Sequence, residues 1–344
     1  MNSVDILLLE YTLGAIILML IPLAPVIYAV WDRKGYEPLP VNLEYTKDPR
    51  AIAKYFDQYF HDSFGDKVLK PGEILNSKKL GKLEVVGETF HRSLYKDMVY
   101  IVGKAKVPDG SRFEREVISR DELEFGNRCY ARVIKSQKKL ILGEENCIVR
   151  WIDSESTITV GRYSHINIAS STSTMHLEKG VSFRRLYGYP VLTSHTFSFR
   201  KNLEGIREEH LDEPSIDENL LYVPDKKYTL KKDTILFHSL VTQGYLMLEQ
   251  NTKIFGNIKS NGDVEVGDNC FIDGNIIAEG SIKIGKNCFV VGNLFSRTSI
   301  EIDSYTQIGT SEHPKSVISK KMITLAEHVA IFNYLLTDEV GEVK

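Results

Sequence analysis

The sequence predicts a mainly β protein, built as a single-stranded β-solenoid with about eighteen residues in each coil. Two observations carry this prediction. A phrase that begins Gly-Asn-Ile or Gly-Asn-Leu recurs at Gly256, Gly274 and Gly292. Each phrase then runs into alternating Ile or Val, such as Val264 and Val266, which is the period of a strand with one buried face. Because one coil cannot bury its own apolar face, the coils must stack.

The repeat extends well beyond those three coils and falls into two parts. We expect a first solenoid block over residues 118–187 and a second over 228–336. Between them, residues 188–227 form an insertion, because its charged centre has no strand period. About five extra residues at 310–316 interrupt the second block, and residues 337–344 form a tail.

Glycines and asparagines suit the corners of such coils. The coil-turn glycines are Gly256, Gly262, Gly267, Gly274, Gly280, Gly285 and Gly292. We expect them to adopt positive φ, which a Cβ would resist. Asn269 and Asn287 suit similar corners, because Asn tolerates the left-handed region. Stacking at about 4.8 Å would then place equivalent residues in ladders.

The four cysteines follow the same spacing. Cys129 and Cys147 are one coil apart, as are Cys270 and Cys288, which predicts a ladder of small core residues. Disulfides and metal ligation are the alternatives. Neighbouring coils lie within disulfide range, but a cytosolic domain keeps its thiols reduced. No further His or Cys stands at ligand spacing, so the sequence predicts no metal and no cofactor.

The N-terminal residues predict a membrane anchor over 1–35. Residues 11–31 carry no charge and are long enough to cross a bilayer of about 30 Å. Acidic residues precede this span and Arg33 and Lys34 follow it, so we expect a single-pass protein with its N-terminus outside and its solenoid in the cytoplasm. A cleaved signal peptide is the alternative, but the basic n-region is missing.

Residues 36–117 predict a small membrane-proximal α/β region. Asp48-Pro49 suits the start of a helix of about fifteen residues. Its aromatic and aliphatic stripe is Ile52, Tyr55, Phe56, Tyr59 and Phe60. The stripe packs on two following strands, at 82–87 and 98–103, or else binds a partner. Such a region would cap one end of the solenoid.

Composition and motifs argue against nucleic-acid binding and against most catalysis. The net charge is −3 and there is no Lys/Arg-rich tract, so we expect no nucleic-acid partner. No familiar catalytic motif is present, and we expect no enzymatic activity. One alternative remains. Apolar residues also recur in sixes from Val266, which resembles the hexapeptide-repeat acyltransferases. That resemblance would make His313, in the loop at 310–316, a general base.

A second resemblance is more specific. The stretch Phe255-Gly-Asn-Ile-Lys-Ser-Asn-Gly-Asp-Val-Glu-Val-Gly267 and its continuation to Ile277 resemble the core of the bactofilins, polymer-forming bacterial cytoskeletal proteins. The resemblance covers roughly residues 240–336. It implies a right-handed β-helix whose coils stack end to end between subunits into nonpolar filaments. It also implies a scaffold at the bacterial inner membrane for cell-wall or polysaccharide enzymes. The period alone suits either handedness.

The chain departs from that family by its second solenoid block, its insertion and its front region. The expected function is therefore a membrane-anchored scaffold that organises cell-envelope machinery, with self-association through coil ends. A non-polymerising accessory subunit of a membrane glycosyltransferase is the alternative, and the acyltransferase is the second. Phe332, Tyr334 and Leu335 in the last coil either form a subunit contact or seal that coil.

Overall fold

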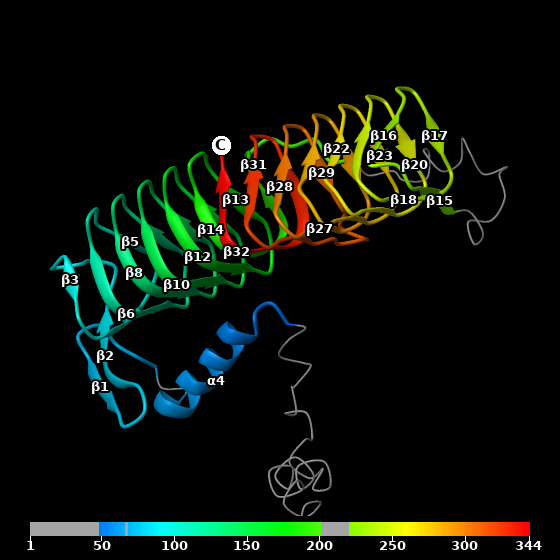
Figure 1. The fold of residues 1–344 in the computed structure, drawn as a ribbon. Coiled ribbons are helices and arrows are strands. Elements are labelled where there is room, and N and C mark those ends of the chain that lie inside the picture. The colour runs from blue at the N-terminus through cyan, green and yellow to red at the C-terminus, as the bar shows by residue number, and fades with distance from the viewer. Residues whose placement is uncertain (1–47, 66–67, 201–219) are drawn as a thin grey trace, which may run out of the picture. The chain divides into compact units, whose positions relative to one another are not determined.

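The computed structural model describes residues 48–65, 68–200 and 220–344. Every described strand belongs to one continuous β-sheet, and Pro49–Lys344 forms one compact unit (Figure 1). The predicted membrane span, residues 11–31, lies outside the described residues with the rest of the predicted anchor. Among the residues that are described, no helix combines the length and apolar composition that a bilayer crossing requires.

One described helix precedes the strands. The sequence predicts a helix from Asp48-Pro49, and α4 (Ala51–Phe64) begins two residues later. Of the two roles expected for its aromatic stripe, the structure shows packing on the following strands. Phe56, Tyr59 and Phe60 contact a buried cluster there. Ile52 and Tyr55 were assigned to the same stripe but are exposed by 48% and 59%.

The first solenoid block alternates short and long strands. Its strands are β1 (Ile74–Ser77), β2 (Gly81–Val86), β3 (Leu94–Tyr95), β4 (Met98–Ile101), β5 (Ala105–Val107), β6 (Arg112–Ser119), β7 (Leu123–Phe125), β8 (Tyr130–Ser136), β9 (Leu140–Leu142), β10 (Cys147–Ser154), β11 (Ile158–Val160), β12 (His165–Ser171), β13 (Met175–Leu177) and β14 (Ser182–Leu192). From β4 onward, the long strands stack in parallel on one another, and so do the short ones. At the outer end, β1 runs antiparallel to β2.

The coils begin earlier than residue 118, where the sequence placed their start. β2 and β4 already pair in parallel, and β4 pairs with β6, so both strands of the expected small sheet are rungs of the solenoid. The physical reason is burial on both faces. Met98-Val-Tyr-Ile101 is buried throughout because α4 covers its outer side, and this removes the alternation that marks a coil with one exposed face.

The second block has three short strands in each coil. Its strands are β15 (Leu220–Val223), β16 (Lys227–Leu230), β17 (Ile235–Leu236), β18 (Ser239–Thr242), β19 (Tyr245–Leu248), β20 (Lys253–Ile254), β21 (Ile258–Ser260), β22 (Val264–Val266), β23 (Phe271–Ile272), β24 (Ile276–Ala278), β25 (Ile282–Ile284), β26 (Phe289–Val290), β27 (Leu294–Ser296), β28 (Ser299–Ile302), β29 (Gln307–Ile308), β30 (Val317–Ser319), β31 (Met322–Leu325) and β32 (Ala330–Val343). Equivalent strands pair in parallel one coil later. The extra residues at 310–316 lengthen one coil, so that Ser316 bonds to Asn293, 23 positions earlier.

The two blocks meet through their last coils. Figure 1 shows the second block starting at the far end of the unit and running back, so that the C-terminus lies in the middle. There β32 pairs with β14 in antiparallel register. The expected tail at 337–344 is part of this arrangement, because Val340 in β32 pairs with Met322 in β31. Within the expected insertion, β14 continues to Leu192 and β15 starts at Leu220.

The repeat glycines have a different role from the predicted one. None of the seven coil-turn glycines has positive φ; that conformation occurs instead at Asn251, Asn269 and Asn287, as expected for the last two. The glycines are required because neighbouring coils approach too closely for a side chain. A Cβ on Gly274 would lie 2.1 Å from the carbonyl oxygen of Gly256. The seven positions therefore need small size rather than conformational freedom.

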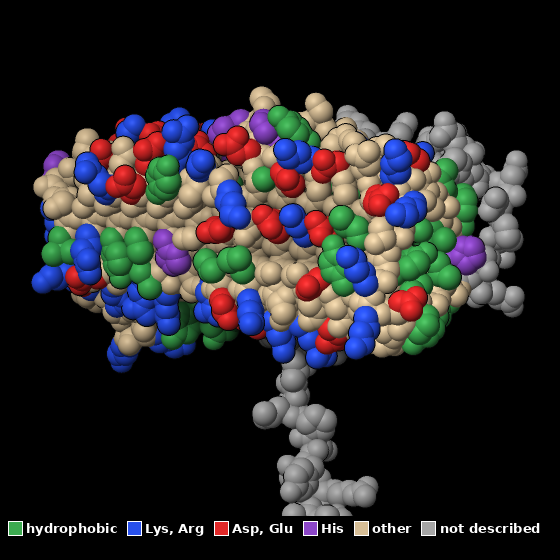
Figure 2. Space-filling view, turned by 45° about the horizontal axis from the view of Figure 1, so that its top comes forward, with side chains coloured by type: hydrophobic (Ala, Val, Ile, Leu, Met, Phe, Trp, Pro, Cys, Tyr) green, Lys and Arg blue, Asp and Glu red, His purple; other side chains and the backbone are tan. Residues whose placement is uncertain are grey.

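The outer surface carries interspersed charges of both signs, as the face in Figure 2 shows. Several of these charges form pairs between stacked coils. Lys138 lies 2.6 Å from Asp121, and Arg297 lies 2.9 Å from Glu279. Opposite charges at stacked positions avoid the repulsion that a ladder of like charges would create.

Candidate functional site at the seam and the helix clamp

The seam is the antiparallel pairing of β14 with β32. Leu186 faces Leu335 and Tyr187 faces Tyr334 across it. Leu186 and Leu335 are both fully buried and belong to one hydrophobic cluster that runs through both blocks. The seam therefore makes one continuous core out of two solenoids whose coils progress in opposite directions.

A strap, residues 193–200, crosses the seam after β14 and is bonded to the second block. The Thr193 amide donates to Val329 O at 3.0 Å, and its hydroxyl donates to Ala326 O at 2.7 Å. At the far end, the Arg200 amide donates to Gln307 Oε1 at 2.9 Å. Phe197 packs on Leu192 and Phe332 between these two attachments.

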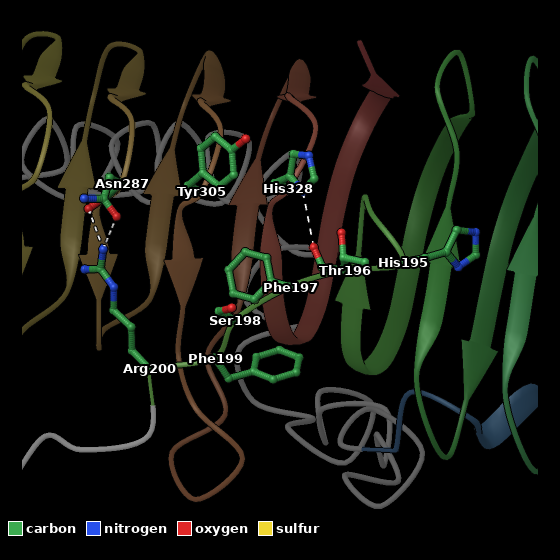
Figure 3. Close-up of a pocket in the computed structure, with 9 residues that line it drawn as sticks. All are labelled: His195, Thr196, Phe197, Ser198, Phe199, Arg200, Asn287, Tyr305 and His328. Atoms are coloured by element: carbon green, nitrogen blue, oxygen red, sulfur yellow. Dashed lines mark hydrogen bonds between the residues drawn. The ribbon is translucent and has the colours of Figure 1, made fainter.

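A groove of about 800 Å³ lies between the strap and the turns of the second block (Figure 3). Tyr305 and His328 form its upper wall as a stacked pair, with ring centroids 4.8 Å apart. His328 Nδ1 donates to Thr196 O at 3.2 Å, and Arg200 donates to Asn287 O at 3.0 Å. The groove is thus lined by a stacked aromatic pair on one side and by the Arg200–Asn287 contact at one end.

A smaller cavity of about 300 Å³ adjoins it and contains a histidine pair. The rings of His176 and His195 are stacked at 4.9 Å, and His195 Nε2 lies 3.6 Å from Glu178 Oε1. His176 Nδ1 is buried and has no hydrogen-bond partner among the described residues. Burial, and then the charge of His195, lower the pKa of His176 below its ordinary value near 6.5.

From the lowered pKa of His176 we expect acid to reduce the stability of the folded chain. Because the pKa of His176 is lower in the folded chain, the unfolded chain takes up the proton first as the pH falls below about 6.5. We expect the free energy of unfolding in urea to be lower at about pH 5.5 than at about pH 7.5. The variant His176→Asn should lose part of that difference. An unchanged pH dependence in this variant would mean that His176 does not contribute.

The helix clamp is a buried ionic cluster that holds α4 against the first block. Arg50 donates twice to Asp153, from Nε to Oδ1 at 2.8 Å and from Nη2 to Oδ2 at 2.7 Å. Lys135 Nζ donates to the same carboxylate at 3.1 Å and lies 2.6 Å from Asp57 of α4. Ser170 Oγ donates to Asp153 Oδ1 at 2.6 Å. Three coils and α4 are therefore tied to one group of charges.

Asp153 is charged at neutral pH in spite of its position. Burial alone would raise the pKa of its carboxyl, but the hydrogen bond from Arg50 and the charges of Lys135 and Arg50 outweigh burial and lower it. Because the folded pKa is depressed, the stability that this carboxylate contributes is present at neutral pH and is lost only in strong acid. The ion pairs of Asp153 with Arg50 and Lys135 therefore persist at neutral pH.

The structure separates the four cysteines into two kinds. Cys270 and Cys288 are buried on neighbouring coils, as a core ladder requires, and their thiols donate to the carbonyl oxygens of Glu249 and Gly267. Cys129 is also buried, but Cys147 lies on the outer side, where it pairs with Tyr130 and His165. Coils of this block differ in length by one residue, so Asn146 takes the position of Cys129 in the next coil. All four thiols are free.

The remaining predicted residues lie apart from any shared site. Phe332 is 6% exposed and Leu335 0%, and both lie at the seam with Tyr334. This position corresponds to sealing the last coil, one of the two roles considered for them. His313 is exposed in its loop, where its backbone amide donates to Thr310 Oγ1 at 3.0 Å. In the described ranges no three His, Cys, Asp or Glu side chains are grouped to hold a metal.

His313→Ala is expected to have no measurable effect on the fold. The side chain is exposed, and exposed substitutions without a specific contact change the free energy of unfolding by less than about 0.5 kcal/mol. Thermal unfolding of the variant beside the wild-type chain measures this. The phenotype of cells that carry the variant should also be unchanged. A defect in a normally folded His313→Ala protein would instead favour the acyltransferase alternative.

Sequence reasoning missed the clamp and the strap. A signal for the clamp exists, since Lys135 and Asp153 are 18 residues apart inside strands that are otherwise buried. Opposite charges at stacked positions within a core strand indicate an ion pair.

Comparisons with protein-family models, with curated proteins and with solved structures gave no match.

Proposed function

We propose that this protein is a membrane-tethered, bactofilin-like scaffold, without chemistry of its own, that organises cell-envelope machinery. In this proposal residues 11–31 hold it in the bacterial inner membrane, and a right-handed solenoid presents its faces to polysaccharide or cell-wall enzymes in the cytoplasm. The observation that carries the proposal is the seam. It joins two solenoids into one hydrophobic core, and a long stack of hydrogen-bonded coils suits a rigid support.

The clamp supports the tethering part of the proposal. Arg50 follows the N-terminal residues directly and is fixed to Asp153 in the middle of the first block. A bidentate, buried Arg–carboxylate contact defines an orientation as well as a distance. A tether that ends at such a contact would join the solenoid at one fixed point.

The seam favours a scaffold that does not polymerise, a property that it would share with the alternative, an accessory subunit of a membrane glycosyltransferase complex. β14 and β32 are the last long strands of their blocks, and each is the other's partner. While the seam is intact, neither of these coil ends can stack on another copy. At the outer end of the first block β1 runs antiparallel to β2 and ends the parallel stack there, so we expect discrete particles rather than filaments that grow at both ends.

Two experiments test the proposal. Electron microscopy of the full chain in detergent or nanodiscs should show separate particles of uniform length, whereas filaments would favour the polymer-forming form of the scaffold. Fluorescence imaging of the cell-envelope glycosyltransferases should show them dispersed in cells that lack this protein. If those enzymes keep their positions in such cells, the scaffold function is wrong.

A further inference from the structure

The left-handed corner of the coils in the second block changes its residue type where the strap passes it. In the coils before the strap, the residue at this corner is Asp or Asn, which adopt positive φ most readily: Asp233, Asn251, Asn269 and Asn287. In the two coils beside the strap the corner is Tyr305 and His328, with φ of 60° and 58°. Tyr163 adopts the same conformation in the first block, so the surroundings of the two rings must decide whether they form a site.

The ring of Tyr305 has one open face. Its other face stacks on His328, with the ring planes 7° from parallel. On the open side the same corner is occupied by Asn287, one coil earlier. The Asn287 side chain is shorter than a tyrosine ring and leaves the outer part of that face uncovered, and Tyr305 is 58% exposed. Figure 3 shows Tyr305 between these two neighbours, with Phe197 and Phe199 on the strap below.

Arg200 determines the charge of the groove. It is the only lining residue with a permanent charge, and none of the described residues that line the groove is acidic. Its Nη2 donates to both the backbone oxygen and the side-chain oxygen of Asn287. These contacts fix the guanidinium and leave further N–H donors for a ligand. Because a planar guanidinium binds a carboxylate through two parallel hydrogen bonds, the groove fits a ligand with a negative group at this end.

The remaining polar groups of the groove are short side chains. Tyr305, Thr196 and Ser198 carry hydroxyls, and Asn287 carries an amide. A ligand that covers such groups must bond to them, because a covered hydroxyl without a partner costs free energy. A sugar ring has hydroxyls on its rim, and the C–H groups of its face pack on the electron-rich face of an aromatic ring. The groove therefore fits a saccharide better than an apolar acid.

The groove is long enough for more than one sugar ring. His195 and His328 line both the groove and the adjoining cavity, so the two form one trough. Their volumes of about 800 and 300 Å³ lie in the range of small-molecule sites. The cavity end has charges of both signs, from Arg162, Lys179, Glu178 and Glu327. A negative group is therefore expected at the Arg200 end, where no carboxylate opposes it.

Two other classes of ligand fit less well. A nucleoside diphosphate carries several negative charges, which helix N-termini and clusters of cations bind best. The one described helix, α4, does not line the groove, and Arg200 is the only permanent cation there. An extended peptide needs unpaired backbone groups. The strap already uses backbone groups of Thr193, Thr196 and Arg200 in bonds to the second block.

We propose that the groove beneath the strap is a binding site for a short acidic oligosaccharide. One sugar ring packs on the open face of Tyr305, its carboxylate accepts hydrogen bonds from Arg200, and the next ring extends toward His195. The site does not rest on the scaffold function. It stands even if the envelope enzymes keep their positions in cells without the protein.

The first experiment measures binding of the fluorescently labelled full chain to an array of bacterial oligosaccharides. The array contains neutral chains and chains with uronic acids, among them trigalacturonate and its methyl ester. We expect acidic chains to bind more tightly than neutral chains of the same length. For the acidic chain that binds best, the methyl ester keeps the rings and removes the charges, and we expect it to bind about tenfold more weakly or worse.

Substitutions then locate the site. Tyr305→Asn removes the aromatic platform and introduces the residue found at Asn287, so the corner should keep its conformation. In isothermal titration with the best acidic oligosaccharide we expect the affinity to fall about tenfold or more. Tyr163→Asn is the matched control, because Tyr163 has φ of 55° and is 61% exposed but does not line the groove. It should leave the affinity unchanged, and equal thermal unfolding would show that both variants are folded.

Arg200→Gln tests the charge. This variant should reduce the preference for the acidic chain over its methyl ester; an unchanged preference would overturn the assignment of the negative group to Arg200. The whole proposal is wrong if the array shows no acidic chain bound above the Tyr305→Asn protein, or if Tyr305→Asn and the wild-type chain bind the best oligosaccharide equally. Tighter binding of ADP than of any oligosaccharide, lost in Tyr305→Asn, would make the groove a nucleotide site instead.

Discussion

Replacing Asp153 by alanine is expected to lower the free energy of unfolding by about 3–5 kcal/mol. The carboxylate is completely buried and receives bonds from Arg50, Lys135 and Ser170. Without it, Lys135 keeps a charge whose side chain is 2% exposed and whose nearest remaining partner is Asp57. Removing the one buried acid of such a network costs several kcal/mol, because Lys135 then has only the half-exposed Asp57 and Glu155 and Arg50 loses its bidentate contact. Urea unfolding followed by circular dichroism measures the change.

A surface pair provides the matched control. Lys138 and Asp121 also stand on neighbouring coils and lie 2.6 Å apart, but the lysine side chain is 60% exposed. Lys138→Ala should therefore have a far smaller effect than Asp153→Ala, because solvent screens the exposed pair. Asp153→Asn tests the charge itself, since it keeps the shape of the side chain. If Asp153→Ala costs no more than Lys138→Ala, the clamp does not hold α4 and the tethering argument fails with it.

The features that could be predicted from the sequence are those that a local period determines. The coil spacing, the place of the five-residue insertion and the positive φ of Asn269 and Asn287 all follow from residues that recur at a fixed distance. α4 was predictable because helical spacing acts within one short segment, although its N-cap is Arg50, with no side-chain cap hydrogen bond, rather than the expected Asp48. In these cases the residues that carry the pattern lie in the same short segment as the element that they form.

The seam could not be predicted because its partners have no local signal. Leu186 and Leu335 face each other from the last coils of the two blocks, far apart in the sequence. An alternating strand looks the same whether its neighbour runs parallel or antiparallel, so the sequence of β32 does not reveal the direction of the second block. The clamp was missed for a related reason. Its charges lie on separate coils and on a helix, and only the stacking brings them together.

The repeat glycines show how one pattern can have two causes. A glycine at a fixed period is compatible with positive φ and equally with a close approach of two backbones. Only the stacked coils decide between the two, because the close approach involves a residue one coil away. At Gly292 the nearest atoms are those of Gly274, whose own nearest atoms are those of Gly256.

Gly292→Ala is therefore expected to destabilise the second block by about 1–3 kcal/mol or more. An added Cβ would lie 1.9 Å from Gly274 O and 2.1 Å from its carbonyl carbon. Both atoms belong to the backbone of a hydrogen-bonded coil, so no side-chain rotation can relieve the overlap. The coils must separate, which lengthens hydrogen bonds and opens the core beside them. Thermal and urea unfolding of the full chain measure the effect.

Gly110→Ala is the control that separates the two causes. Gly110 has φ of 69°, and nothing lies within 4 Å of the position that its Cβ would take. Its substitution therefore measures the cost of the left-handed conformation alone, about 1–2 kcal/mol. Gly292 has no such conformational demand, so any loss at that position comes from contact between coils. If Gly292→Ala unfolds at the same urea concentration as the wild-type chain, the coils are less closely packed than the stack requires, and the argument for a rigid support weakens accordingly.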